Sequence, residues 1–233
     1  MKLVIGDIHA CYEELLDLLE LAGLGEEDEI LAVGDLVDRG PDNQGVLDFF
    51  RRRPRASSIL GNHERKHLRS ARGEIKPAPS QIITRAQLGE RYDEALGFLA
   101  GLPRHCDWPE AYVVHGFWEP GVPLEKQRDT VVVGTLSGEH HLRKHYDRPW
   151  YELYDGSKPL IVGHLDYRHD GQPLIYQDKV FAIDTGCCHG GRLTGLLLPA
   201  FRILSVPARA DHWRETCRRF AHLVEPGEEG GRQ

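Results

Sequence analysis

Six polar side chains that could bind a metal ion each follow a short apolar segment of the chain. They are Asp7, His9, Asp35, Asn62, His115 and His164. Most of them have a glycine beside them, and glycine lets the backbone turn sharply and leaves room for a ligand. Carboxylate, amide and imidazole groups without thiolates suit Mn²⁺, Fe or Zn²⁺. The pattern therefore predicts a metal centre at the ends of several strands.

The spacing allows two metal ions. One could bind Asp7 and His9, which are two residues apart, so an extended segment would point both to the same side. Asp35 is a candidate bridge, and the second metal would take the remaining side chains, Asn62, His115 and His164. Two metals about 3.5–4 Å apart can clamp a phosphate and convert a shared water into a hydroxide nucleophile. The sequence contains no G-x-S-x-G and no Walker A loop, so we expect no side-chain nucleophile.

Phosphate chemistry also needs a cation that fits phosphate and a proton for the leaving oxygen. Arg39 lies four residues after Asp35, and a guanidinium matches phosphate geometry better than an ammonium. His63, beside Asn62, is the candidate general acid. Asp38 is the carboxylate that we expect to hold His63 as imidazolium and to raise its pKa. The alternative for Asp38 and Arg39 is a local ion pair in a turn.

The stretch GNHERKH, residues 61–67, can also be read as H-E-x-x-H, a zinc protease signature. That interpretation needs a helix that presents His63 and His67, a third ligand, and Glu64 as the base. Because Gly61 directly follows an apolar strand, we expect a loop at His63. We therefore favour the interpretation in which this stretch belongs to a metal centre that acts on phosphate. Glu64 then orders the loop through hydrogen bonds to nearby backbone, and His67 is an ordinary helix histidine.

The elements that must position these residues repeat in the first third of the chain. Strands are expected at 2–5, 29–33 and 57–60, and helices at 11–22, 42–50 and after residue 62. Three strand–turn–helix units in series predict an α/β fold with parallel strands, whose carboxyl edge is the usual ligand site. Residues 72–110 look like an excursion, a segment that departs from this repeated pattern, with a helix at 81–100.

The second half of the chain is rich in expected strands. They are AYVVHG (111–116), DTVVVG (129–134), PLIVGH (159–164), VFAIDTG (180–186), RLTGLLLP (192–199) and FRILSV (201–206). A final helix is expected within 210–223, and the polar tail 224–233 is expected to be disordered. We therefore predict one domain over residues 1–223, with no linker.

Composition excludes several classes of protein. The net charge of −7 argues against a stable nucleic-acid complex, which depends on an excess of Lys and Arg. The apolar run at the N-terminus is too short for a signal segment or a membrane span, so we expect a cytoplasmic protein without a membrane partner. The sequence does not indicate an oligomeric state.

The five cysteines contain no C-x-x-C pair, which suits a reducing compartment and argues against a structural zinc knuckle. We expect Cys187 and Cys188 to be small buried hydrophobic residues, with a redox role as the alternative.

The segments GDIHA, GDLVDRGP, GNHE, VVHG and VGH resemble the motifs of the calcineurin-like metallophosphoesterases, and within them the phosphoprotein phosphatase family. AIDTGCCHGGRLTGLLLP resembles the C-terminal segment of its bacterial branch. That branch includes Ser/Thr/Tyr phosphatases, diadenosine tetraphosphatases and the phosphatase domain of RNA-repair enzymes. The resemblance covers about residues 2–206 and implies an αββα sandwich with a dimetal site at the C-terminal ends of its strands.

The resemblance also implies roles for individual residues. The metal ligands would be Asp7, His9, Asp35, Asn62, His115 and His164. Arg39 and Asn62 would bind the substrate, His63 and Asp38 would form the acid pair, and Asp184 would order the site. The sequence departs from the family pattern at Ala10, Phe117 and Leu165-Asp166, and a second phosphate-binding arginine has only candidates: Arg128, Arg143 and Arg168.

The leading hypothesis is a serine/threonine protein phosphatase that hydrolyses phosphomonoesters with a metal-bridging hydroxide. Its cofactors would be two divalent ions, with Mn²⁺ favoured over Fe or Zn²⁺. The alternative substrates are a bis(5′-nucleosyl) tetraphosphate such as diadenosine tetraphosphate, another nucleotide, or an RNA end. The partner is therefore a phosphorylated protein or a nucleotide. The remaining hypotheses are the zinc protease and a metal-binding scaffold without turnover, although no ligand is missing from the set.

Overall fold

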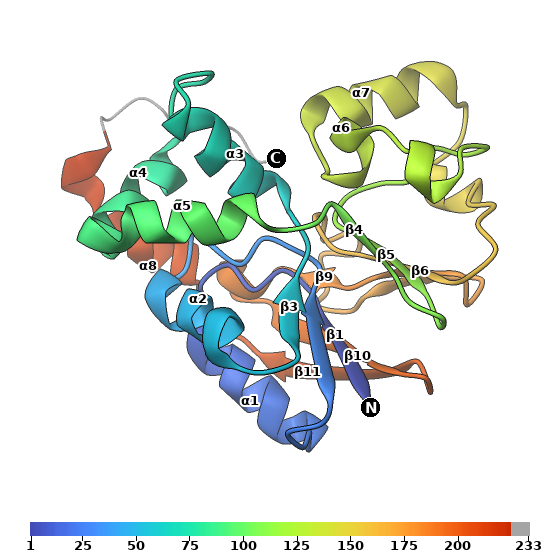
Figure 1. Cartoon of the computed structure of the whole chain (residues 1–233), viewed down its shortest axis with the longest axis horizontal. Coiled ribbons are helices and arrows are strands. Elements are labelled where there is room, and N and C mark those ends of the chain that lie inside the picture. The colour runs from blue at the N-terminus through green and yellow to red at the C-terminus, as the bar shows by residue number, and fades with distance from the viewer. Residues whose placement is uncertain (225–233) are drawn as a thin grey trace.

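Two mixed β-sheets pack face to face, and helices cover the outer face of each sheet (Figure 1). The computed structural model describes residues 1–224, so the predicted tail lies outside the described residues except for residue 224. The four layers confirm the predicted αββα sandwich. The prediction that residues 1–223 form a single domain stays a prediction.

The first sheet has the strand order β11-β10-β1-β2-β3, with β9 paired to β10. Its strands are β1 (Lys2–Ile5), β2 (Glu29–Ala32), β3 (Ala56–Ser58), β9 (Asp184–Thr185), β10 (Arg192–Leu198) and β11 (Arg202–Pro207). Strands β1, β2 and β3 are parallel, as predicted from the repeated strand–turn–helix units. Their carboxyl ends therefore meet at one edge of the sheet.

The second sheet has the order β4-β5-β6-β8-β7. Its strands are β4 (His105–Asp107), β5 (Tyr112–Val114), β6 (Leu160–Val162), β7 (Leu174–Tyr176) and β8 (Val180–Ala182). Strands β5, β6 and β8 are parallel, and the two flanking strands are antiparallel to their neighbours. This sheet has a parallel centre, like the first.

Helices fall into two groups, one for each sheet (Figure 1). The first group is α1 (Tyr12–Ala22), α2 (Asn43–Arg52), α3 (Asn62–Ala71), α4 (Pro79–Leu88), α5 (Tyr92–Ala100) and α8 (His212–Arg219), and the second is α6 (Asp129–Val132) and α7 (Leu136–His145). Asp42 caps α2, since its side chain accepts a hydrogen bond from the Gly45 N–H. Within residues 1–224, none of the helices has the length and apolar character that a membrane crossing requires.

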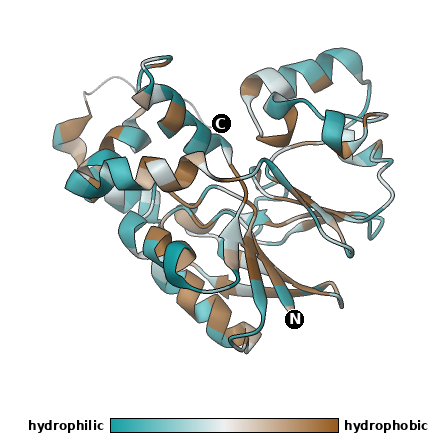
Figure 2. Cartoon of the chain, viewed as in Figure 1, coloured by the Kyte–Doolittle hydropathy of each residue, from teal (hydrophilic) through white to brown (hydrophobic). Residues whose placement is uncertain are grey.

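Alternating side chains along the central strands divide the core into three clusters. Leu3 and Ile5 of β1 pack toward α1 and α2, whereas Val4 between them packs into the space between the sheets. In β6, Ile161 faces the space between the sheets and its two neighbours pack toward α6 and α7. Strands buried on both faces read as continuous hydrophobic runs, which explains their brown colour in Figure 2.

The predicted strand at 129–134 is wrong, because residues Asp129–Val132 form the short helix α6. Val131, Val132 and Val133 are all buried in the core cluster that packs against the second sheet. The apolar run is therefore buried by a helical turn and does not need a strand. Gly134 then ends the turn at a φ of 69°. Tertiary burial has overridden the strand preference of valine.

We predict that Leu18→Ala lowers the free energy of unfolding by about 2–5 kcal/mol, because it leaves a cavity in the core. Leu18 lies on α1 and is 0% exposed, whereas Leu21 on the same helix is 52% exposed. The matched variant Leu21→Ala should change the same free energy by only about 0.5 kcal/mol. Urea denaturation followed by circular dichroism measures both, and equal losses would contradict this packing of α1.

Candidate functional site

The predicted ligands gather at the carboxyl edge shared by the two sheets. Asp7 follows β1 and Asp35 follows β2, while His115 and His164 follow β5 and β6 of the other sheet. The backbone N–H of His164 lies 3.0 Å from Asp7 Oδ1 and 3.1 Å from Oδ2, so it donates to that carboxylate across the sandwich. The edge therefore brings together residues from both halves of the chain.

Asp35 lies at the centre of this cluster. Its Oδ2 is 3.5 Å from His9 Nε2, and its Oδ1 is 3.4 Å from His115 Nε2. Two groups of ligand atoms, each within 4.8 Å of one another, contain it: one with His9 and His63, the other with His115 and His164. A carboxylate shared by two such groups has the position that a bridging ligand requires.

Hydrogen bonds to the backbone orient two of the histidines. His9 Nδ1 lies 2.9 Å from the Val37 carbonyl oxygen, and His115 Nδ1 lies 2.9 Å from that of Val33. Because a carbonyl accepts only, each Nδ1 carries the proton, and each Nε2 presents a lone pair to the centre. Both rings are thus oriented to coordinate a metal.

The donor set fits divalent cations. Asn62 Oδ1 faces His115 Nε2 at 3.0 Å, and both atoms are acceptors in this orientation. The opposite orientation of the amide would let its NH₂ group donate to Asp35 and His115, whereas a cation satisfies the same acceptors with the oxygen turned inward. Burial, with repulsion from Asp184 and Asp35, raises the pKa of Asp7, and positive charge at the centre would relieve this crowding.

Several site residues have backbone conformations that non-glycine residues seldom adopt. Positive φ angles occur at His9 (47°), Asp35 (50°), Asp38 (75°), Arg39 (68°) and His164 (72°). The expected extended segment from Asp7 to His9 is therefore wrong, because the chain turns sharply at His9 instead. Such strain clusters at functional sites, where the surrounding contacts hold it.

His63 and Asp38 form the predicted pair. His63 Nδ1 lies 2.6 Å from Asp38 Oδ2, so the Nε2 atom of the ring points into the site, 4.0 Å from Asp35 Oδ2. Arg39 Nη1 lies 3.1 Å from His9 Nε2, which places the guanidinium at the same centre. The alternative of a local Asp38–Arg39 ion pair is not what forms, because each side chain has other partners.

Asp38 acts to raise the pKa of His63 as expected, but the net shift of that pKa is downward, so the expected imidazolium is not favoured. Burial lowers the pKa of His63 below its usual value and outweighs the nearby carboxylates of Asp35 and Asp38. Full removal of the ring from water penalises its charged form more than the two partners favour it. The predicted contact between His63 and Asp38 is therefore present, but it does not determine the direction of the pKa shift.

Asp38 has several further partners that the sequence did not indicate. His67 Nε2 lies 2.8 Å from Asp38 Oδ1, so His67 is a buried partner of this carboxylate and not an ordinary helix histidine. The remaining donors come from α4: the Ser80 hydroxyl at 3.1 Å, the Gln81 amide at 2.8 Å and the Thr84 hydroxyl at 2.7 Å. The excursion at 72–110 therefore closes over the acid pair.

Glu64 orders the loops as predicted. Its carboxylate accepts hydrogen bonds from the N–H groups of Asp35, Leu36, Val37 and Gly61. His63 lies in the first turn of α3, not in a loop, so that expectation is wrong. The zinc protease interpretation nevertheless fails, because Glu64 is bound to backbone and both histidines are hydrogen-bonded to Asp38.

Asp184 lies beside the cluster and accepts a hydrogen bond from the Gly186 N–H at 3.0 Å. Burial raises the pKa of Asp184 to about 6, and the charges of Asp166 and Asp35 add to this effect. The candidates for a second phosphate-binding arginine each pair with a nearby carboxylate: Arg128 with Glu119, Arg143 with Glu139, and Arg168 with Asp170. None of them is brought to the cluster by a contact between described residues.

Comparisons with known proteins agree with this arrangement. The family model of the calcineurin-like phosphoesterases matches residues 2–167. The chain is 30% identical to the asymmetrical bis(5′-nucleosyl)-tetraphosphatase PrpE of Halalkalibacterium halodurans, over 93% of this chain and 98% of that protein. A crystal structure presented as that of a candidate diadenosine tetraphosphatase is 28% identical, with a TM-score of 0.70, and covers 89% of this chain and 93% of its own.

A serine/threonine phosphatase from Saccharomyces cerevisiae shares the fold. It is 15% identical, with a TM-score of 0.57 over 90% of this chain and 79% of its own. At this level of identity the likeness concerns the architecture alone.

We predict that Gly163→Ala weakens Mn²⁺ binding by about 10–100-fold, the usual cost of displacing a group that orients a metal ligand. A Cβ at this position would lie 2.1 Å from Asp7 Oδ1 and 2.5 Å from Val33 Cγ2, so the Asp7 carboxylate must move. Gly97 on α5 has no neighbour within 4 Å of such a Cβ, so Gly97→Ala is the matched control. Isothermal titration measures both, and an unchanged affinity in Gly163→Ala would remove Asp7 from the metal centre.

Proposed function

The chain belongs to the calcineurin-like phosphoesterase family, and we propose that this metal-dependent phosphoester hydrolase acts on a bis(5′-nucleosyl) tetraphosphate. The observation that supports hydrolysis is the convergence of His9, His115 and His164 around Asp35, with Asp7 and Asn62 beside them. The substrate is supported by the relatives that cover nearly the whole chain. The sequence alone favours a phosphoprotein, with the nucleotide as its alternative substrate.

A phosphoprotein is the second candidate, because the same chemistry serves a phosphorylated serine or threonine. The serine/threonine phosphatase structure from Saccharomyces cerevisiae shares the fold at 15% identity, which does not bear on the substrate. Two tryptophans that could stack on a base do not discriminate between the substrates, since Trp118 and Trp150 are 2% and 7% exposed and pack in the core. The choice between the substrates therefore rests on the relatives and on the experiment below.

We propose that one divalent ion binds Asp7 and His9 and a second binds Asn62, His115 and His164, with Asp35 between them. When bound, the ions supply Lewis-acid charge to phosphate oxygens and acidify a water molecule at neutral pH. The absence of thiolates among these six ligands favours Mn²⁺, with Fe or Zn²⁺ as alternatives.

Arg39 and Asn62 would orient the phosphate. The guanidinium stays charged at every relevant pH, and its planar N–H groups can bind two phosphate oxygens at once. Its position 3.1 Å from His9 Nε2 places these donors beside the metal ligands. Arg39 would thus hold the negatively charged phosphate of the substrate on the side of the cluster where β1 and β2 end.

His63 would give a proton to the leaving oxygen from Nε2. Its other nitrogen is bonded to Asp38, and the four additional side chains bonded to Asp38 hold that carboxylate in one orientation. The P–O bond breaks as water attacks phosphorus, and the departing oxygen takes the proton. Burial of the acid pair excludes bulk water from competing for this proton.

A cytoplasmic location is part of this proposal. Within residues 1–224 the structure has no disulfide among the five cysteines, as expected for a protein of a reducing compartment.

The substrate is tested with a panel in Mn²⁺ that contains diadenosine tetraphosphate, a phosphoserine peptide, a 2′,3′-cyclic nucleotide and an aryl phosphate. We expect kcat/KM for diadenosine tetraphosphate to exceed that for the peptide by at least about tenfold, or 1.4 kcal/mol in transition-state stabilisation. Asp35→Asn should abolish turnover of every compound. A peptide preference would favour the phosphoprotein instead, and an absence of turnover with any divalent metal would refute the proposed hydrolysis.

The acid role of His63 is tested by the leaving group. His63→Asn should lower kcat by about 10²–10⁴-fold for an alkyl phosphate, whose alkoxide needs a proton, and by less for an aryl phosphate. His169, whose side chain is 83% exposed, offers the matched control His169→Asn with unchanged rates. An equal loss on both substrates would indicate that His63 supports the structure of the site and does not donate a proton.

A further inference from the structure

A second cluster of ligand-type side chains lies behind the loop that carries His9. Cys11, Glu14 and Cys187 place one sulfur or oxygen atom each within 4.8 Å of the others, and all three residues are buried. Cys11 directly precedes α1, Glu14 lies in the first turn of that helix, and Cys187 begins the short helix η4 (Cys187–His189). Segments from the two ends of the chain therefore meet at this point.

Glu14 contributes an oxygen without a partner. Its Oε1 accepts hydrogen bonds from His212 Nε2 at 2.6 Å and from the Arg209 N–H at 2.8 Å. Its Oε2 is buried and has no hydrogen-bond partner among the residues that the structure describes. Burial acts to raise the pKa of Glu14, but the bonds from His212 and Arg209 prevail and lower it. The residue is thus an ionised carboxylate with one buried oxygen unsatisfied, which is costly unless a cation or donor meets it.

The two thiols do not satisfy this oxygen. The Cys11 thiol lies 3.5 Å from the carbonyl oxygen of His9 and donates there. One atom of each of the two thiols and the carboxylate thus lies within 4.8 Å of the others, and Glu14 Oε2 receives a hydrogen bond from neither thiol.

We propose that Cys11, Glu14 and Cys187 bind a zinc ion, at a site separate from the catalytic metal centre. Zn²⁺ accepts thiolate and carboxylate ligands at about 2.3 Å and 2.0–2.2 Å, so tetrahedral binding separates the ligand atoms by about 3.5–3.8 Å. The present separations of at most 4.8 Å need only small movements to reach this geometry. Binding replaces the two S–H bonds with two Zn–S bonds and releases both protons to solvent.

The surroundings of Glu14 suit a structural metal site. His212 and the Arg209 N–H hold Oε1, so they fix the carboxylate and leave the buried Oε2 available to a metal, as partners of metal-bound carboxylates do. The ligand type also separates the two metal sites, because thiolates select Zn²⁺ whereas the oxygen and imidazole set at Asp35 suits Mn²⁺. The neighbouring Cys188 thiol is hydrogen-bonded to the Arg39 guanidinium, so zinc would brace the segment behind the phosphate-binding arginine.

Cobalt substitution tests the site without reference to catalysis. The full chain is stripped with a chelator under reducing conditions and titrated with Co²⁺. We expect sulfur-to-cobalt charge-transfer absorption in the near ultraviolet, which the proposed ligands at Asp35 cannot produce because they include no sulfur. The double variant Cys11→Ser/Cys187→Ser should lose this band. Asp35→Asn should keep it, so failure of the catalytic proposal and failure of this one are distinguishable.

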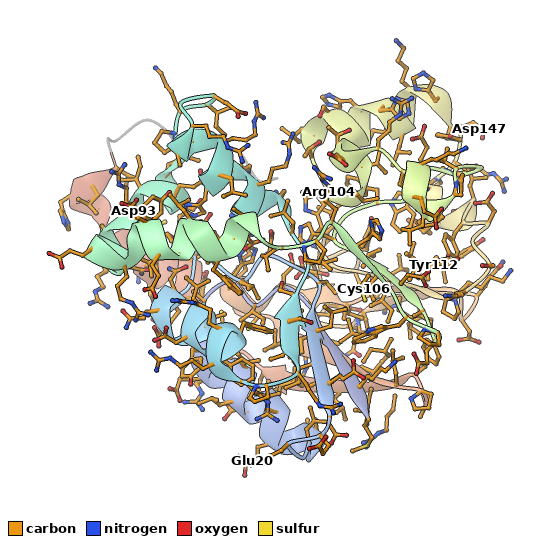
Figure 3. The ribbon with its side chains drawn as sticks, in the orientation of Figure 1. Glu20, Asp93, Arg104, Cys106, Tyr112 and Asp147 are labelled. Atoms are coloured by element: carbon orange, nitrogen blue, oxygen red, sulfur yellow. The ribbon has the colours of Figure 1, made fainter. Side chains whose placement is uncertain are left out.

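A matched cysteine control is available in Cys106, labelled in Figure 3, which lies on β4 of the second sheet and outside the cluster. Cys106→Ser should keep the charge-transfer band. Glu14→Gln keeps both thiols and should weaken Zn²⁺ affinity by at least about tenfold, measured by competition against Co²⁺. This variant tests the site even if the double cysteine variant fails to fold.

Three results would overturn the proposal. They are the absence of the charge-transfer band in the wild-type protein, a band that persists in the folded double variant, and an unchanged Zn²⁺ affinity in Glu14→Gln. A fourth such result is an intact mass lower by two hydrogen atoms, with Cys11 and Cys187 unreactive to alkylation after denaturation, because it would identify a disulfide in place of the metal site.

Discussion

One buried carboxylate, that of Glu64, holds the arrangement on which the rest of the site depends. Its Oε2 accepts N–H bonds of 2.8 Å from Asp35 and 2.9 Å from Gly61, and its Oε1 accepts one of 2.8 Å from Leu36. These donors belong to the loops after β2 and β3, so a single side chain sets the distance between the central carboxylate and the start of α3. Gly61 leaves room for this contact, since a Cβ there would lie 2.2 Å from Asp35 Oδ1.

The strained backbone at the site follows from the same constraint. Asp35, Asp38 and Arg39 all have positive φ angles, and an isolated loop would relax away from them at a gain of about 1–3 kcal/mol each. The bonds from Glu64 to the N–H groups of Asp35 and Leu36 hold the first part of this loop, and the Asn43 side chain accepts from the Asp38 N–H at 2.8 Å. The loop is therefore fixed before any ligand binds, which favours a preorganised site.

The site residues that directly follow strands could be predicted from the sequence. Those that reach the site from other elements could not. Asp7, Asp35 and His115 were predictable because parallel strands end at a common edge and each strand had a clear apolar pattern. Thr84, by contrast, reaches Asp38 from 46 positions along the chain, and no local spacing announces such a contact. The turn at His9 escaped prediction for a related reason: its left-handed backbone is stabilised by tertiary contacts, and its residue type does not reveal it.

The hydrogen bond from the His164 N–H to Asp7 joins residues 157 positions apart. A chain that emerges from the ribosome from its N-terminus can form the loops of the first sheet early, but this loop closure must wait for β6. The nascent protein therefore passes through a stage in which Asp7, His9 and Asp35 stand exposed on an incomplete edge. A complete set of the proposed metal ligands therefore requires this closure, which can form only after the first of those ligands have been made.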